Sequence, residues 1–166
     1  MKHQSFIGVG SNLGNRRANC QASLDRLGCL SGTMLHRVST FVESEPQEGV
    51  EGGPFLNAVA EIATSLSPRQ LLGSLQEIEV ALGRAPDHLP GTARTMDLDL
   101  LLYGDAVIRE ADLTIPHPRL VERWFVLAPL VGLDPELRHP VLRVTMASLL
   151  QRLDSEAPRV SPGRVR

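Results

Sequence analysis

The stretch RTMDLDLLLYG, residues 94–104, constrains this chain more than any other, because it places two acids inside an apolar segment. Side chains alternate between the two faces of a strand, so Asp97 and Asp99 lie on one face and the leucines beside them on the other. Two carboxylates roughly 5 to 6 Å apart repel by about 3 kcal/mol at an effective dielectric near 20. The pattern predicts either a positive partner between the acids, or an edge strand whose charges discourage pairing with another sheet.

Composition limits the class of protein. The 166 residues fit one domain, which we place at residues 1–154, followed by a flexible tail at 155–166. The formal net charge of −2 lacks the basic excess of a nucleic-acid-binding protein. No apolar run approaches the ~20 residues of a membrane helix, and the first residues lack a signal peptide's apolar length, so we expect a cytoplasmic protein. Cys20 and Cys29 lack the spacing of a zinc site and are expected to be reduced, structural thiols.

Apolar periodicity predicts the element order β-α-β-β-α-β. Strand patterns cover residues 5–10, 34–44 and 55–66 and the acidic stretch, and a first helix lies between the first two strands. The second helix is predicted over 67–83, with Ser67 as N-cap, Pro68 in the first turn and Gly83 as the stop. This order is typical of a ferredoxin-like α+β fold, in which an antiparallel sheet carries its helices on one face. Additional C-terminal helices are predicted within residues 117–133 and 145–153.

The acidic face suits magnesium, which prefers oxygen ligands and often takes one or two carboxylates together with substrate phosphates. Four arginines bracket the acids and are candidates for binding phosphate oxygens: Arg84, Arg94, Arg119 and Arg123. Each arginine taken singly is typical of a solvated surface charge. Their combination with the acids favours phosphate chemistry.

Three further motifs bear on a ligand site. His117 stands between two prolines that stiffen its backbone, and it either faces phosphates or only caps the following helix. Phe55 and Asn57 share one face of a strand, where a ring and an amide could recognise a flat heterocycle, although strand aromatics are more often core. The turn GSNLGN lacks the lysine and hydroxyl of a Walker sequence, so we interpret it as structural, with Asn12 supporting the site.

Taken in order, GSNLGNR, FLNAV, LLGSLQEIEVALGR, RTMDLDLLLYG and IPHPRLVERWFVLAPL resemble the 6-hydroxymethyl-7,8-dihydropterin pyrophosphokinases of folate biosynthesis. The resemblance covers nearly the whole chain. It implies transfer of pyrophosphate from ATP to 6-hydroxymethyl-7,8-dihydropterin, leaving AMP, with two Mg²⁺ ions and no nucleophilic side chain. The expected partners are these two small substrates, and the expected state is a monomer.

The resemblance also implies a role for individual residues. Asp97 and Asp99 would hold both metal ions and form the catalytic group with Arg84 and Arg94, and Asp97 is the candidate to accept the substrate's hydroxyl proton. The implied ATP-binding set is Gln76, Arg84, Arg94, Leu100, His117 and Arg123. The implied pterin-binding set is Ser44, Phe55, Asn57 and Phe125, and Glu79 joins Asn12 as a support.

Two alternatives stay open. Paired acids on a ferredoxin-like strand also occur in nucleotide cyclases and polymerase palms, but that class does not account for FLNAV or IPHPRL. A binding module that kept the pocket and lost turnover is the other alternative. The loop 85–93 lacks the tryptophan and the extra basic residue that some relatives place over the substrates, and Asp112 stands where some relatives have a basic residue. We therefore expect this loop to cover the substrates less effectively than in those relatives, and the nucleotide affinity to differ.

Overall fold

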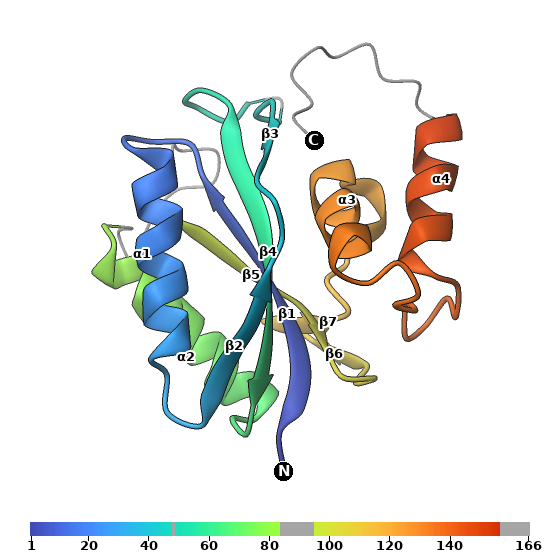
Figure 1. The fold of residues 1–166 in the computed structure, drawn as a ribbon, viewed down its shortest axis with the longest axis horizontal. Helices are drawn as coiled ribbons and strands as arrows, with labels where there is room; N and C mark the ends of the chain where they lie inside the picture. The colour runs from blue at the N-terminus through green and yellow to red at the C-terminus, as the bar shows by residue number, and fades with distance from the viewer. Residues whose placement is uncertain (48, 84–94, 157–166) are drawn as a thin grey trace.

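The computed structural model describes residues 1–47, 49–83 and 95–156. Its main sheet is antiparallel and has the strand order β2-β4-β1-β5, with β3 also paired to β4 (Figure 1). The strands are β1 (His3–Ser11), β2 (Thr33–Val38), β3 (Val42–Ser44), β4 (Phe55–Thr64) and β5 (Asp97–Tyr103). Helices α1 (Arg16–Gly28) and α2 (Pro68–Ala81) cover one face of this sheet, so the predicted ferredoxin-like arrangement is confirmed.

Local signals in the sequence account for α2. The Ser67 hydroxyl accepts a hydrogen bond from the Gln70 backbone N–H, while the Gln70 side chain accepts one from the Ser67 N–H. This reciprocal cap satisfies two N–H groups that a helix start leaves without partners. Gly83 follows the last turn with a φ of 108°, a left-handed conformation that glycine adopts without strain. The predicted start and stop are therefore both confirmed.

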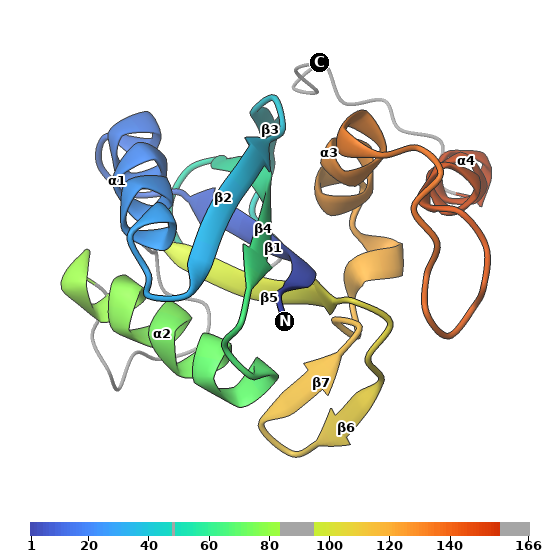
Figure 2. The ribbon, with the colours of Figure 1, turned by 60° about the horizontal axis from the view of Figure 1, so that its bottom comes forward.

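Three other elements differ from the prediction. The strand expected over 34–44 is interrupted between β2 and β3, where the Ser39 hydroxyl accepts a hydrogen bond from the Val59 N–H. The helix expected within 117–133 divides into a 3-10 turn, η1 (Leu120–Glu122), and α3 (Trp124–Leu133), because the backbone of Arg123 is extended. A hairpin of β6 (Ile108–Glu110) and β7 (Leu113–Ile115), which the sequence did not predict, follows β5 (Figure 2).

The sheet is covered on both faces. On the first face, Leu98 and Leu100 of β5 pack with α1 and α2. On the second face, Leu101 packs in one apolar cluster with Leu127 and Leu130 of α3, both fully buried, and α4 (Met146–Glu156) packs against α3. Complete burial of one such leucine contributes about 1.5 to 3 kcal/mol, so α3 is held firmly on the sheet. The face of β5 that carries the acids is therefore the face toward α3.

The structure corrects the predicted start of the C-terminal tail and the role expected of one cysteine. Helix α4 continues through Glu156, so residues 155 and 156 are helical, while the rest of the predicted tail lies outside the described residues. Both cysteines are free: Cys20 is buried, which raises its thiol pKa to about 11, whereas Cys29 is exposed and so does not fit the structural role expected of it.

Within the described residues, no helix has both the length and the apolar character needed to cross a membrane.

Candidate active site

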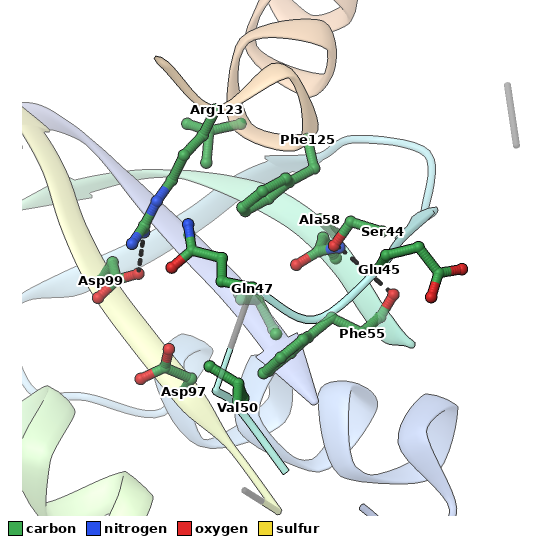
Figure 3. A pocket seen from close by; sticks show the side chains of 15 residues that line it. Ser44, Glu45, Gln47, Val50, Phe55, Ala58, Asp97, Asp99, Arg123 and Phe125 are labelled. Atoms are coloured by element: carbon green, nitrogen blue, oxygen red, sulfur yellow. Dashed lines mark hydrogen bonds and ion pairs between the residues drawn. The ribbon is translucent and has the colours of Figure 1, made fainter. Parts of the chain in front are cut away.

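A cavity opens between the second face of the sheet and the start of α3. It has about 630 Å³ of space including its solvent-open mouth, and β1, β3, β4, β5 and α3 all contribute to its walls (Figure 3). Seven of the residues that the sequence singled out line this one cavity: Ser44, Phe55, Asn57, Asp97, Asp99, Arg123 and Phe125. These residues come from segments up to 81 positions apart, since Ser44 and Phe125 both contribute. The fold therefore brings the predicted metal and pterin residues together.

The two acids project from β5 into the cavity (Figure 3). Leu98, between them, is buried on the opposite face with α1 and α2. The strand alternation inferred from the sequence is thus confirmed. Asp97 lies opposite Gly10 of β1, and Asp99 lies opposite Gly8, so each acid has a glycine beside it on the neighbouring strand.

Arg123 supplies a positive charge next to Asp99. Its Nη1 lies 3.6 Å from Asp99 Oδ2, and its side chain is 18% exposed. The Nε of Arg123 is buried and has no hydrogen-bond partner within the described part of the chain. A buried N–H without a partner is rare in a native protein, so this donor is available to an anionic ligand. The extended backbone at Arg123, between η1 and α3, is what directs the guanidinium to the acids.

His117 lies in a turn and also reaches the candidate site. Its Nδ1 accepts a hydrogen bond from the Arg119 N–H at 3.2 Å, which is the turn role, and its Nε2 lies 3.9 Å from Asp99 Oδ1, which places the ring at the site. Burial, followed by the positive charge of Arg123, lowers the pKa of His117 from 6.5 to about 4. The imidazole is therefore neutral at neutral pH, with its proton on Nε2.

Aromatic rings and one amide form the other end of the cavity. The rings of Phe55 and Phe125 enter from opposite sides, one from the sheet and one from α3 (Figure 3). The Asn57 Nδ2 donates to Ser44 Oγ at 2.8 Å and to the Val42 carbonyl at 3.3 Å. These bonds fix the orientation of the amide, so Asn57 presents a constant polar edge to a ligand.

The described residues between β3 and β4, 45–47 and 49–54, contribute Glu45, Gln47 and Val50 to one wall and are tied to the rest of the chain. Asn12 Nδ2 donates to the Glu51 carbonyl at 2.8 Å, and Arg16 Nη1 donates to the Pro54 carbonyl at 2.8 Å. In the same loop, Gln47 Oε1 accepts a hydrogen bond from Arg119 Nη1 at 3.1 Å. Asn12 is 5% exposed, so it is buried beneath the loop whose backbone it binds. This position suits a residue that supports the site.

Glu79 supports the acidic strand from α2. Its Oε2 accepts a hydrogen bond from the Leu98 N–H at 2.8 Å, and Glu79 is 8% exposed. Leu98 is the residue between the two acids, so this bond fixes the backbone from which both carboxylates project. An acceptor in this position satisfies a strand N–H that would otherwise be buried without a partner.

A second, shallower depression adjoins the first at Asp99. It is lined by Leu72, Leu100, Asp112 and Thr114, together with His117. Gln76 is exposed on α2, one helical turn beyond Leu72.

Arg69 donates two hydrogen bonds to Asp112, and this contact lowers the pKa of the Asp112 carboxyl. The predicted residues Arg84 and Arg94 and the loop 85–93 lie outside the described residues.

Sequence reasoning missed several lining residues, including Gly8, Gly10, Gln47 and Val50. For the glycines a signal was present: the pattern GVG places both on one face of β1, and glycine inside a strand often marks a close backbone approach. For Gln47 and Val50 there was no local signal, because loop residues reach a site only through the path of the loop.

The donor set at the acids fits a hard cation. Asp97 and Asp99 offer carboxylate oxygens on one side of an open cavity, which is the chemistry that Mg²⁺ prefers. Among the described residues there is no group of three or more His, Cys, Asp or Glu side chains that could hold a metal ion. A fully protein-coordinated metal is therefore not indicated there, whereas an ion shared between two carboxylates and substrate oxygens is compatible with the site.

Comparison with known proteins shows the family. A family model described as 7,8-dihydro-6-hydroxymethylpterin-pyrophosphokinase matches residues 6–135. The 2-amino-4-hydroxy-6-hydroxymethyldihydropteridine pyrophosphokinase of Haemophilus influenzae is 37% identical over 95% of this chain and 98% of its own length. The protein of the same name from Pseudomonas aeruginosa is 40% identical over 84% of this chain and 86% of its own length.

Some relatives are much longer. The folic acid synthesis protein fol1 of Schizosaccharomyces pombe is 38% identical over 94% of this chain, which spans only 21% of that protein. A crystal structure of Plasmodium falciparum HPPK-DHPS with pteroate superposes with a TM-score of 0.78 at 13% identity, covering 100% of this chain and 48% of that one, and so supports the fold alone. From the family model and the bacterial relatives together, this chain belongs to the 7,8-dihydro-6-hydroxymethylpterin-pyrophosphokinase family.

Proposed function

We propose that the protein transfers the pyrophosphoryl group of ATP to the hydroxymethyl group of 6-hydroxymethyl-7,8-dihydropterin, giving AMP and the pterin diphosphate. The observation that carries this proposal is that one cavity joins the acidic face of β5 to a pocket with two phenylalanine rings and an oriented amide. Phosphate chemistry alone would require the acids but not the rings. A pterin is a flat polar heterocycle, and this combination suits it.

Asp97 and Asp99 are proposed to hold two Mg²⁺ ions. Their carboxylates share one face of β5 and open into the cavity, beside the second depression. When bound, the ions would neutralise charge on the triphosphate of ATP. Two carboxylates on adjacent same-face positions also repel each other, and bound cations relieve that repulsion.

The remaining residues are proposed to bind, orient and balance charge. Phe55 and Phe125 would stack against the pterin, while Asn57 and Ser44 recognise its edge. Asp97 would accept the proton of the attacking hydroxyl. Because phosphoryl transfer leaves little covalent work for the protein, this positioning and charge balance are the main contributions we expect.

The phosphates and the nucleotide are proposed to lie along the side of the cavity next to Asp99. Arg123 offers an unpartnered Nε there, and neutral His117 can donate from its Nε2. Arg84 and Arg94 complete this group in the proposal, from outside the described residues. Leu100 lines the second depression, and Gln76, one helical turn beyond its lining residue Leu72, completes the predicted nucleotide side.

The deciding experiment measures AMP release from ATP by purified protein, with and without the pterin, and with magnesium present or chelated. We expect AMP only when the pterin and magnesium are both supplied. Release that ignores the pterin, or a cyclic or polymeric nucleotide product, contradicts the proposal in favour of cyclase or polymerase chemistry. Pterin binding without any AMP identifies a binding module instead.

The proposed enzyme works as a cytoplasmic monomer that needs no nucleic acid or membrane. Light scattering coupled to gel filtration checks the oligomeric state, with an expected mass near 18.1 kDa. A mass of twice this value contradicts the monomer.

A further inference from the structure

Two glycines of β1 form the floor of the cavity between its acidic end and its aromatic end. Gly10 lies opposite Asn57 on β4 and opposite Asp97 on β5, and Gly8 lies opposite Asp99. Paired residues of antiparallel strands project to the same face, so both glycines face the cavity. Gly10 therefore occupies the one floor position between a proposed metal ligand and a proposed pterin-binding amide.

The backbone does not require glycine at either position. Neither Gly8 nor Gly10 is among the glycines with positive φ, and both are paired on two sides within a regular strand. Glycine inside a strand weakens it, because the unfolded chain has more freedom to lose and no side chain packs in the sheet. A position that carries this penalty without a conformational reason points to the space that the missing side chain leaves.

That space is bounded most tightly at Gly10. A Cβ built there would lie 3.3 Å from Asn57 Oδ1 and 3.6 Å from Phe55 Cδ1. Asn57 has little freedom to move aside, because its Nδ2 is bonded to Ser44 and Val42. At Gly8 the nearest atoms are those of Leu101 at 3.5 Å and Asp99 at 3.6 Å, which are ordinary contact distances.

We propose that Gly10 is a specificity-determining residue that sets the depth of the pocket: its missing side chain leaves room for the bicyclic ligand to reach the β1 backbone between Asn57 and Asp97. The proposal rests on the proposed function, since it identifies the ligand as the pterin. A methyl group at this position would occupy part of the ligand's space and would also press on the amide that recognises its edge. It would leave the second depression, on the nucleotide side, unchanged.

The test compares Gly10→Ala with the wild type by titration calorimetry, using the pterin in the presence of magnesium and a non-hydrolysable ATP analogue. We expect pterin affinity to fall at least tenfold, while the affinity for the analogue alone stays within twofold. Gly132→Ala is the matched control, because Gly132 is an exposed residue of α3 with no atom within 4 Å of its Cβ position. Wild-type pterin affinity in the Gly10→Ala protein would overturn the proposal.

Gly8→Ala separates a specific effect from a general weakening of β1. Its methyl group would lie beside Leu101 and Asp99 and away from Asn57, so we expect a smaller loss of pterin affinity than for Gly10→Ala. Equal losses in the two variants would show a general effect on the strand and would overturn the role assigned to Gly10.

A measurement on the wild type covers the case in which Gly10→Ala fails to fold. In an isotope-labelled sample, the Gly10 Hα signals should shift on pterin addition and show contacts to ligand protons, whereas those of Gly132 should not change. Absence of both effects overturns the proposal. The AMP assay keeps the two ideas distinct: an active wild type with an unaffected Gly10→Ala variant refutes only the role of Gly10, whereas a wild type that binds no pterin refutes both.

Discussion

At the residue scale, the proposed chemistry depends most on Asp97. The variant Asp97→Asn keeps the size of the side chain and removes its charge, so we expect turnover to fall by about a hundredfold or more with the fold retained. Asp25→Asn, on the exposed face of α1, is the matched control and should keep full activity. The measurement is AMP release at saturating substrates together with a thermal melt. A variant with normal, magnesium-dependent turnover would contradict the metal assignment.

Phe125 tests the aromatic end of the site. Truncation in Phe125→Ala removes one of the two rings that enter the cavity from opposite sides. Lost stacking and burial should weaken pterin binding by about 1 to 3 kcal/mol, with little change in ATP binding. Phe41→Ala is the control, since the Phe41 ring packs under Arg17 and outside the cavity. Calorimetry that finds unchanged pterin affinity for Phe125→Ala would remove this ring from the pocket.

At the element scale, the bond between α2 and β5 positions both acids. Glu79→Ala deletes the acceptor of the buried Leu98 N–H and should lower the free energy of unfolding by about 1 to 3 kcal/mol. Glu79→Gln keeps an acceptor oxygen and should recover most of that loss. Urea denaturation measures the stabilities, and AMP release shows whether activity follows the same order. Equal destabilisation of the two variants would mean that the bond to Leu98 is not the main contribution of Glu79.

The break between η1 and α3 also matters for the site, because Arg123 lies at this break. A continuous helix through residues 117–133 would keep Arg123 in a helical conformation, whereas its observed φ and ψ are −113° and 99°. This extended link joins η1 to α3, and the Arg123 guanidinium at this link lies 3.6 Å from Asp99. A helical pattern in the sequence does not reveal such a break, because Leu120, Trp124 and Leu127 keep helical apolar spacing across it.

At the scale of the whole molecule, a buried histidine makes stability depend on pH. His139 is 6% exposed, and its Nδ1 accepts hydrogen bonds from the N–H groups of Val141 and Leu142, so the folded state favours the neutral ring. Burial lowers the pKa of His139 below 6.5. The unfolded chain then binds more protons than the folded one just below pH 6.5, and stability falls as the pH falls.

The variant His139→Asn isolates this effect, because its side-chain oxygen can accept the same turn hydrogen bonds without titrating. We expect the stability of the wild type to decrease relative to the variant between pH 7 and pH 5, as measured by urea denaturation at each pH. His36→Asn, at an exposed position of β2, is the matched control for replacing a histidine. A constant difference between wild type and His139→Asn across this range would contradict the argument.

More of the fold than of the candidate site could be predicted from local signals in the sequence. Strand alternation placed Asp97 and Asp99 on one face, and the cap at Ser67 fixed the start of α2, because both signals act over a few residues. The element order then indicated the ferredoxin-like sheet. The family resemblance indicated which distant residues share a pocket, and the cavity contains all four that it assigned to pterin binding.

The sequence by itself thus determined the β-α-β-β-α-β order of the main elements and the face on which the acids lie. Only the tertiary structure decided that α3 covers the second face, that the Arg123 guanidinium lies next to Asp99, and that Gly10 lines the cavity. The physical reason is the distance along the chain over which each kind of signal acts. Periodicity and capping depend on neighbours within one or two turns, whereas a cavity depends on which distant surfaces pack together and on the space that their side chains leave unfilled.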